Sequence, residues 1–122
     1  MPKGDPLVTP YRKGKWIEFL ACLALRFKGY IPVARRFKSR NGEIDLIAIA
    51  PNKTLVAVEI KFRKTRLEAH QSITPHQQKR IKHTLNFFLS LNPKYHTYNL
   101  RFDVFFVTYF GFQHIKQAWI EG

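Results

Sequence analysis

The sequence has few acidic residues and a single cysteine, and each shortage narrows the class of protein. Only 8 of its 122 residues are Asp or Glu, against 21 Lys and Arg, which gives a formal net charge of +13. This excess is unusual for an enzyme of small neutral metabolites and favours a polyanionic partner, with nucleic acid first. Because Cys22 stands alone, an internal disulfide and a cysteine-rich zinc site are both excluded.

Long hydrophobic segments are also missing. The first residues, Met1 to Pro6, hold no apolar stretch typical of a signal peptide, and no later run approaches the ~20 apolar residues of a membrane span. We therefore expect a cytoplasmic protein that does not bind a membrane. With 45% hydrophobic and 15% aromatic residues, the chain can bury the core of one domain.

Helix signals occur twice in the chain. Three of the seven prolines fall in residues 1–10, which predicts an irregular arm ahead of a single domain over 11–122. Apolar residues at helical spacing predict a helix over 14–28. Thr74 as an N-cap and Pro75 at the first helical position predict a second helix that ends at Asn92. Residues 64–73 show no pattern and are expected to form a loop.

Strand signals fill most of the remaining chain. β-branched and aromatic runs predict three consecutive strands, over 30–38, 43–50 and 54–62, and a fourth over 100–109. A short strand or helical turn is expected over 113–120. The order α-β-β-β-α-β predicts an α/β protein with a mixed central β-sheet flanked by helices.

Three of the acids lie close together in sequence, on two predicted strands of one hairpin. With a loop at 51–53, Asp45 lies opposite Glu59, and Glu43 lies opposite Lys61. Like charges in such a pair destabilise a sheet, and the neighbouring strand segments are apolar on both faces, so the carboxylates need a partner. One candidate is a divalent cation, and the other is a bridge from Lys61 or a nearby arginine.

The spacing of Asp45, Glu59 and Lys61 matches the pattern of PD-(D/E)xK nucleases, with a structural ion cluster as the alternative. In a nuclease, Asp45 and Glu59 would bind Mg²⁺ or Mn²⁺ and Lys61 would orient water or neutralise charge on the phosphate. Glu18, on the predicted first helix, would reach a second metal or a metal-bound water. A solvated position for Glu18, or a salt bridge to Arg26 or Lys15, fits its pattern equally well.

Basic residues concentrate near these acids and predict a nucleic-acid surface, with a generally basic solvated surface as the alternative. The start of the second helix adds two glutamines as candidate phosphate ligands, although capping is the simpler role for Gln77. The predicted nucleic-acid-binding residues are Arg35, Arg36, Lys38, Arg40, Arg63, Lys64, Arg66, Gln77, Gln78, Lys79, Arg80 and Lys82.

Several stretches resemble the YraN family, a set of small endonuclease-like bacterial proteins that are similar to Holliday-junction resolvases. They are Gly42 to Ala48, Val58 to Arg63, Ile73 to Pro75 and Arg101 to Val104. The resemblance implies a restriction-endonuclease-like fold. It also implies a metal-dependent site made by Glu18, Glu43, Asp45, Glu59 and Lys61. Gln77 departs from the family, which usually carries lysine there, and residues 67–71 replace its usual glycine-rich turn.

These observations predict a Mg²⁺- or Mn²⁺-dependent endonuclease acting on DNA, with branched or damaged DNA among the candidate substrates. A nucleic-acid-binding domain without catalysis and a factor that assists RNA or ribosome assembly are the alternatives. A junction resolvase would need a homodimer to cut two strands symmetrically. Among the remaining residues, Asp103 is expected to bond Arg101 or a neighbouring backbone group, Trp16 to lie in the core, and the histidines to lie on the surface.

Overall fold

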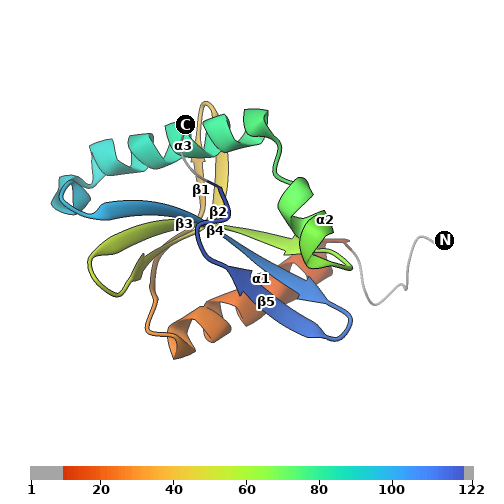
Figure 1. Ribbon diagram of the computed structural model, residues 1–122. Helices are drawn as coiled ribbons and strands as arrows, with labels where there is room; N and C mark the ends of the chain where they lie inside the picture. The colour runs from red at the N-terminus through yellow and green to blue at the C-terminus, as the bar shows by residue number, and fades with distance from the viewer. Residues whose placement is uncertain (1–9, 120–122) are drawn as a thin grey trace.

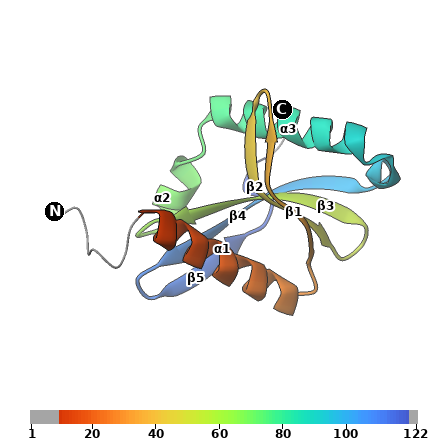
Figure 2. The same ribbon diagram turned by 180° about the vertical axis from the view of Figure 1, so that it is seen from behind.

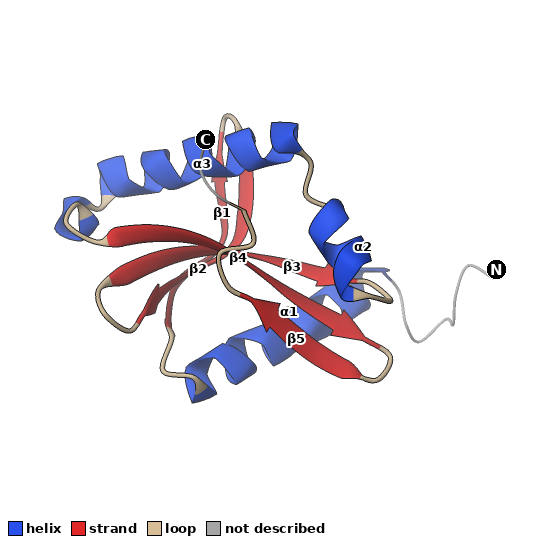
Figure 3. Cartoon of the chain, in the orientation of Figure 1, coloured by secondary structure: helices blue, strands red, loops and turns tan. Residues whose placement is uncertain are grey.

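The computed structural model describes residues 10–119 and contains a five-stranded sheet with helices on both faces (Figures 1 and 3). Among these residues, no helix is long and apolar enough to cross a membrane. The elements are α1 (Pro10–Phe27), β1 (Ile31–Ser39), β2 (Gly42–Ala50), β3 (Thr54–Phe62), α2 (Arg66–Gln71), α3 (Pro75–Leu91), the 3₁₀ turn η1 (Pro93–Tyr95), β4 (Asn99–Thr108) and β5 (Gly111–Ile115).

The sheet has the strand order β1-β2-β3-β4-β5. Neighbouring strands are antiparallel except β3 and β4, which are parallel. A parallel pair needs a crossover connection, and α2, α3 and η1 supply it. Figure 2 shows α1 and α3 on opposite faces of the sheet. The prediction of a mixed α/β sheet flanked by helices is therefore confirmed.

Residues alternate along β3 between two hydrophobic clusters, one on each face. Leu55 and Ala57 pack on the α3 face together with Ile81, whereas Val56 and Val58 pack on the α1 face. Since side chains two apart on a strand share a face, Glu59 and Lys61 continue the α3 face. The hydrophobic pattern of β3 thus decides where its charged end points.

The predicted loop over 64–73 is wrong in its centre, where residues 66–71 form α2. Thr65 caps this helix by accepting a hydrogen bond from the Glu68 backbone N–H at 3.1 Å, and the Glu68 carboxylate accepts one from the Lys64 N–H at 3.1 Å. The arrangement differs from a capping box in that the Glu68 carboxylate bonds the N–H of the residue before the N-cap, and not that of the N-cap itself. Ala69 is the buried residue of α2, and a single small apolar residue gives no periodicity in the sequence.

Helix α1 begins at Pro10, inside the predicted arm, and the rest of that arm lies outside the described residues. Ile17, Ala21 and Leu25 form its buried stripe. The prediction that Trp16 lies in the core is wrong, because 64% of this residue is exposed. Leu20, Cys22 and Ala24 pack at the edge of this stripe, whereas the side chains of Trp16, Phe19, Leu23 and Phe27 face outward.

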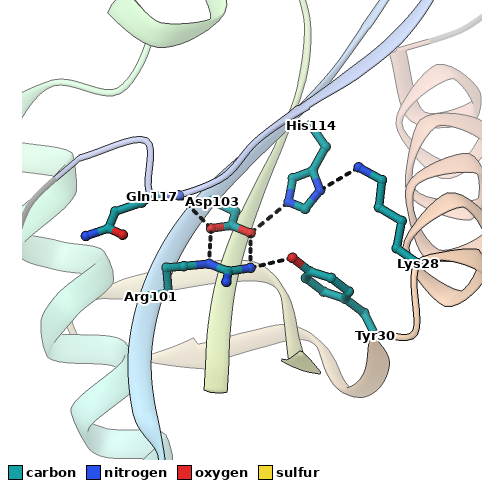
Figure 4. Close-up of polar contacts among 6 residues, drawn as sticks. All are labelled: Lys28, Tyr30, Arg101, Asp103, His114 and Gln117. Atoms are coloured by element: carbon teal, nitrogen blue, oxygen red, sulfur yellow. Dashed lines mark hydrogen bonds and ion pairs between the residues drawn. The ribbon is translucent and has the colours of Figure 1, made fainter. Parts of the chain in front are cut away.

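A network of polar side chains joins β4 and β5 to the segment that follows α1 (Figure 4). The Asp103 carboxylate is fully buried and accepts hydrogen bonds from the Arg101 guanidinium at 2.9 and 3.0 Å and from the Gln117 backbone N–H at 2.9 Å. Arg101 also donates to the Tyr30 hydroxyl. The prediction that Asp103 bonds Arg101 is confirmed, and the backbone group that it also bonds comes from the segment after β5.

His114 completes the network, and its predicted surface position is wrong. Its side chain is 1% exposed, and its Nε2 lies 2.7 Å from the Asp103 carboxylate, while the Lys28 Nζ lies 3.0 Å from its Nδ1. Burial alone would raise the pKa of Asp103. Hydrogen bonds from His114, Arg101 and the Gln117 backbone outweigh that effect and hold its pKa below the usual value of 3.8.

We expect Asp103→Asn to lower the free energy of unfolding by about 2–4 kcal/mol at pH 7, because it removes the negative charge beside Arg101 and replaces one acceptor oxygen with an NH₂ group that faces buried donors. A carboxyl with a lowered pKa stabilises the fold above its ordinary pKa and loses that effect as the pH falls. The difference from wild type should therefore shrink between pH 7 and pH 3. Urea unfolding at both pH values measures it. Glu43→Gln, at an exposed acid, is the control, and a difference that does not change with pH would contradict the assignment.

Candidate metal and nucleic-acid site

A pocket of about 580 Å³ lies where the charged ends of β2 and β3 meet the first turn of α3. We call it the strand-end pocket. It brings together residues from three separate parts of the chain. Its lining residues are Gly42, Glu43, Asp45, Glu59, Ile60, Lys61, Thr74, His76, Gln77, Arg80 and Ile81.

The hairpin register places the acids in this pocket. Backbone pairing of β2 with β3 runs from Ala50 opposite Thr54 to Leu46 opposite Val58, which is the register predicted from the loop. One step further, the Asp45 carboxylate accepts a hydrogen bond from the Ile60 backbone N–H at 2.9 Å. At this point a side-chain carboxylate, and not a backbone carbonyl of β2, accepts the hydrogen bond from β3. This bond fixes Asp45 beside Glu59.

Glu59 is the most deeply buried member of the pocket's charged set. It is 4% exposed, and its Oε1 atom has no hydrogen-bond partner among the described residues. Burial and the adjacent charge of Asp45 raise the pKa of Glu59 to about 8. Burial likewise raises the pKa of Asp45, against the Ile60 hydrogen bond and the positive charge of Lys61. At neutral pH the pair therefore tends to hold a proton.

The donor set fits a hard divalent cation. The carboxylates of Asp45 and Glu59 face one pocket, and a buried oxygen of Glu59 has no hydrogen-bond partner among the described residues. Mg²⁺ is usually bound by one or two carboxylates, with water and substrate phosphate as the other ligands. Within residues 10–119 no cluster of three or more His, Cys, Asp or Glu side chains could hold a metal. A site for Mg²⁺ or Mn²⁺ here would therefore depend on Asp45 and Glu59, with the other ligands supplied from outside the chain.

Glu18 does not line the strand-end pocket. Its carboxylate pairs with the Arg36 guanidinium, with a closest N–O distance of 2.8 Å and two hydrogen bonds from Arg36 Nε at 2.9 and 3.2 Å. The structure therefore does not bring Glu18 to the metal position predicted for it. Its negative charge still contributes to the raised pKa of Asp45.

Arg80 is the cation that α3 contributes to the pocket. Its Nε donates a hydrogen bond to the Asn41 carbonyl in the turn between β1 and β2. Gly42 lies against the same guanidinium, where an added Cβ would come within 3.4 Å of Nε, and its φ of +154° also favours glycine. The turn and the helix thus hold Arg80 at the edge of the pocket.

Most of the other predicted nucleic-acid-binding residues lie outside the pocket. Gln77 lines it, and the Gln77 backbone N–H donates to the Thr74 hydroxyl at 3.1 Å, which confirms the predicted N-cap. Gln78 instead donates to the Ile73 carbonyl at 3.3 Å. The predicted cations that do not line the pocket are Arg35, Arg36, Lys38, Arg40, Arg63, Lys64, Arg66, Lys79 and Lys82.

His76 is exposed, as expected for the histidines, and it also lines the strand-end pocket, a position that its sequence pattern does not indicate. It follows Pro75 in the first turn of α3. Its position in the chain is the one available signal, because the first turn of this crossover helix lies beside the end of β3.

Comparison with known proteins places the chain in a family. The sequence matches the uncharacterised protein family UPF0102 over residues 17–107. The chain belongs to the UPF0102 family. Similar UPF0102 proteins occur in Parvibaculum lavamentivorans (38% identity over 96% of this chain and 90% of the relative) and Chelativorans sp. (44% over 77% and 75%). Another occurs in Maricaulis maris (37% over 90% and 87%).

The match to UPF0102 supports the family membership that the sequence resemblance indicates. Its span runs from the middle of α1 into β4, and every residue of the strand-end pocket lies inside it. The relatives' names state no substrate or reaction. For this UPF0102 protein, the chemistry of the pocket must be inferred from its geometry.

We expect Glu59→Gln to stabilise the protein at pH 8 and to have little effect at pH 4.5. A carboxyl whose pKa is raised in the folded state stabilises the fold fully below its ordinary pKa of 4.5 and loses that contribution as the pH rises toward 8. Glutamine mimics the protonated acid, so the gain at pH 8 should reach about 2 kcal/mol or more, at about 1.4 kcal/mol for each pKa unit.

Chemical unfolding in the presence of EDTA at pH 4.5, 6 and 8 measures this difference. Glu43→Gln removes an exposed acid from the same pocket and should change the pH dependence much less than Glu59→Gln, because the charge of Glu43 is only a minor cause of the raised pKa of Asp45. A wild-type stability that stays level between pH 4.5 and 8 would show that Glu59 titrates normally.

Proposed function

We propose that this protein is a divalent-metal-dependent endonuclease that hydrolyses phosphodiester bonds in DNA. The observation that carries the proposal is the meeting of Asp45, Glu59 and Lys61 in one pocket, where a buried Glu59 oxygen has no hydrogen-bond partner among the residues that the structure describes. Structural carboxylates in a core are normally satisfied by hydrogen bonds, as Asp103 is. An unsatisfied one beside a second acid is better explained by a cation.

The topology supports a placement among restriction-endonuclease-like folds of the PD-(D/E)xK type. A meander of three antiparallel strands carries the acids, a helical crossover follows, and a parallel strand returns beside β3. The acidic residue of β2 and the Glu-x-Lys sequence of β3 lie at adjacent strand ends, as the motif requires. The resemblance to junction-resolvase-like proteins makes branched DNA the first substrate to test.

Each residue of the strand-end pocket has a separate role in the proposed hydrolysis. Asp45, oriented by the Ile60 N–H, and Glu59 would hold Mg²⁺ or Mn²⁺. When bound, such an ion polarises a phosphodiester oxygen and lowers the pKa of water. The Lys61 ammonium neutralises charge that develops on the phosphate, and Glu43, at the exposed rim, orients water. Arg80 and Gln77 bind the neighbouring phosphates from the start of α3.

One observation favours a second candidate, a nucleic-acid-binding domain without catalysis. Gln77 lines the pocket as an uncharged side chain, at the position where YraN-like proteins usually carry lysine. A lost positive charge weakens phosphate positioning more than it weakens overall binding, because the net charge of +13 still attracts DNA. Cleavage, and not binding, separates the two functions.

In a cleavage assay we expect Mn²⁺-dependent cutting of DNA that Asp45→Asn and Glu59→Gln each reduce by about 100-fold or more, because each removes a charged metal ligand. Lys61→Met should reduce the rate without abolishing Mn²⁺ binding. The substrates are linear duplex, single-stranded DNA, a four-way junction and duplex RNA, each with Mn²⁺ or EDTA. Lys53→Gln, in the turn between β2 and β3, is the charge-matched control for Lys61→Met.

Three outcomes would contradict the nuclease proposal. Cutting that survives both acid substitutions would come from another site or a contaminant. DNA binding with no cleavage of any substrate would leave the binding-domain alternative, and a strong preference for duplex RNA would favour an RNA-associated role.

Binding by Arg80 can be tested separately from cleavage. We expect Arg80→Gln to weaken DNA binding in EDTA by roughly tenfold and to lower the slope of log affinity against log salt by about one, since it removes one phosphate contact. Lys53→Gln removes an equal charge at the far end of the hairpin. Titrations over a range of NaCl concentrations compare the two variants, and equal effects would mean that only net charge matters.

A further inference from the structure

A second pocket lies on the other side of the sheet, between the outer surface of α1 and β1. Its volume is about 260 Å³, and its walls combine apolar side chains with two guanidinium groups. We call it the α1 pocket. It shares no residue with the strand-end pocket, and its lining residues are Phe19, Cys22, Leu23, Arg26, Pro32 and Arg35.

The apolar wall belongs to a longer exposed stripe on α1. Trp16 and Phe19 stack with ring centroids 6.2 Å apart, and Leu23 and Phe27 continue the stripe at intervals of four residues. All four are exposed, and Phe27 is 86% exposed. Scattered apolar residues are normal on protein surfaces, but a contiguous row beside a concave pocket is typical of an interaction site.

The two arginines of the pocket indicate that its ligand is negatively charged. Arg26 and Arg35 both line the α1 pocket, and no acid is among its lining residues. Glu18, one turn before Cys22 on α1, pairs with Arg36. A ligand that complements this pocket must therefore carry negative charge beside an apolar group.

Three kinds of partner can be compared by how well they supply negative charge beside an apolar group. In a second copy of the chain, a two-fold axis through the pocket would set Arg26 and Arg35 against the same arginines across the interface. A lipid surface supplies negative charge but has no side chain to fill a concave pocket. An acidic peptide segment supplies both groups, with carboxylates for the arginines and one large apolar side chain for the cavity.

We propose that the α1 pocket binds an acidic peptide segment of a partner protein, anchored by a large apolar side chain. The apolar anchor lies between Phe19, Leu23 and Pro32, and flanking carboxylates pair with Arg26 and Arg35. Because the strand-end pocket lies on the α3 face, both sites can be occupied at once. The peptide would bring a partner to the protein without blocking the strand ends.

The probe is a fluorescein-labelled peptide of four aspartates followed by leucine and a C-terminal phenylalanine. We expect a dissociation constant in the micromolar range by fluorescence anisotropy in 0.1 M NaCl. Arg26→Gln and Leu23→Ser should each weaken binding at least tenfold, and a peptide with alanine in place of the phenylalanine and leucine should bind equally poorly. Leu23 is partly exposed, so its substitution is compatible with folding, which circular dichroism checks.

The sole cysteine provides an independent readout. Cys22 lines the pocket, so the bound peptide should slow its alkylation by at least a few-fold in wild type and not in Arg26→Gln. Lys53→Gln is the control for lost charge and should leave both readouts unchanged.

Several results would overturn the proposal. They are equal binding of the alanine peptide, unchanged binding by Leu23→Ser, and absence of peptide binding up to millimolar concentration. Self-association that Leu23→Ser abolishes, without peptide binding, would assign the stripe to a second copy of the chain. Leu23-dependent binding to vesicles of three parts phosphatidylcholine to one part phosphatidylglycerol, without peptide binding, would assign it to a lipid surface.

Discussion

The hydrophobic register of β2 and β3 forces two carboxylates into one buried position, and the candidate site depends on that constraint. Leu46 and Val58 lie opposite each other and are fully buried. Because a shift of one residue would turn every side chain of a strand to the other face, the core prevents Asp45 and Glu59 from separating. The folding energy of an ordinary hydrophobic hairpin thus maintains a pair of acids whose mutual repulsion opposes folding.

Two buried acids on adjacent strands show how the surrounding hydrogen-bond donors decide the state of a buried carboxylate. Asp103 on β4 receives hydrogen bonds from side chains and from the backbone, and its pKa falls. Glu59 on β3 has an oxygen without a hydrogen-bond partner in the described part of the chain, and its pKa rises. Burial raises the pKa of both, so the difference comes from the donors around them. Asp103 is stable without a ligand, whereas Glu59 is stabilised by a proton or a cation.

The strand-end acids could be predicted because their arrangement depends on a short loop and a period of two. The hairpin loop at 51–53 fixes the register, and alternation along β3 fixes the face. The burial of His114 could not be predicted, because Lys28 comes from a distant part of the chain and the contact with Asp103 depends on the register of β4 with β5. Likewise, the pairing of Glu18 with Arg36 depends on how α1 crosses β1. For helix α2, Thr65 as a possible N-cap and Glu68 three residues later are a sequence signal of a helix start. Its single buried residue, Ala69, gives no hydrophobic period that would show how far the helix extends.

The sheet also separates basic side chains that lie among acids from basic side chains that lie among apolar residues. On the α3 face, Lys61 and Arg80 lie among acids, where a cation and phosphates can share the same pocket. On the α1 face, Arg26 and Arg35 lie among apolar side chains. The phosphate backbone of a duplex has no large apolar side chain to pack against Phe19 and Leu23. We therefore do not assign every positive charge behind the net charge of +13 to nucleic-acid binding. Electrostatic attraction brings anions to the entire surface, and the neighbours of each guanidinium decide which anion stays bound.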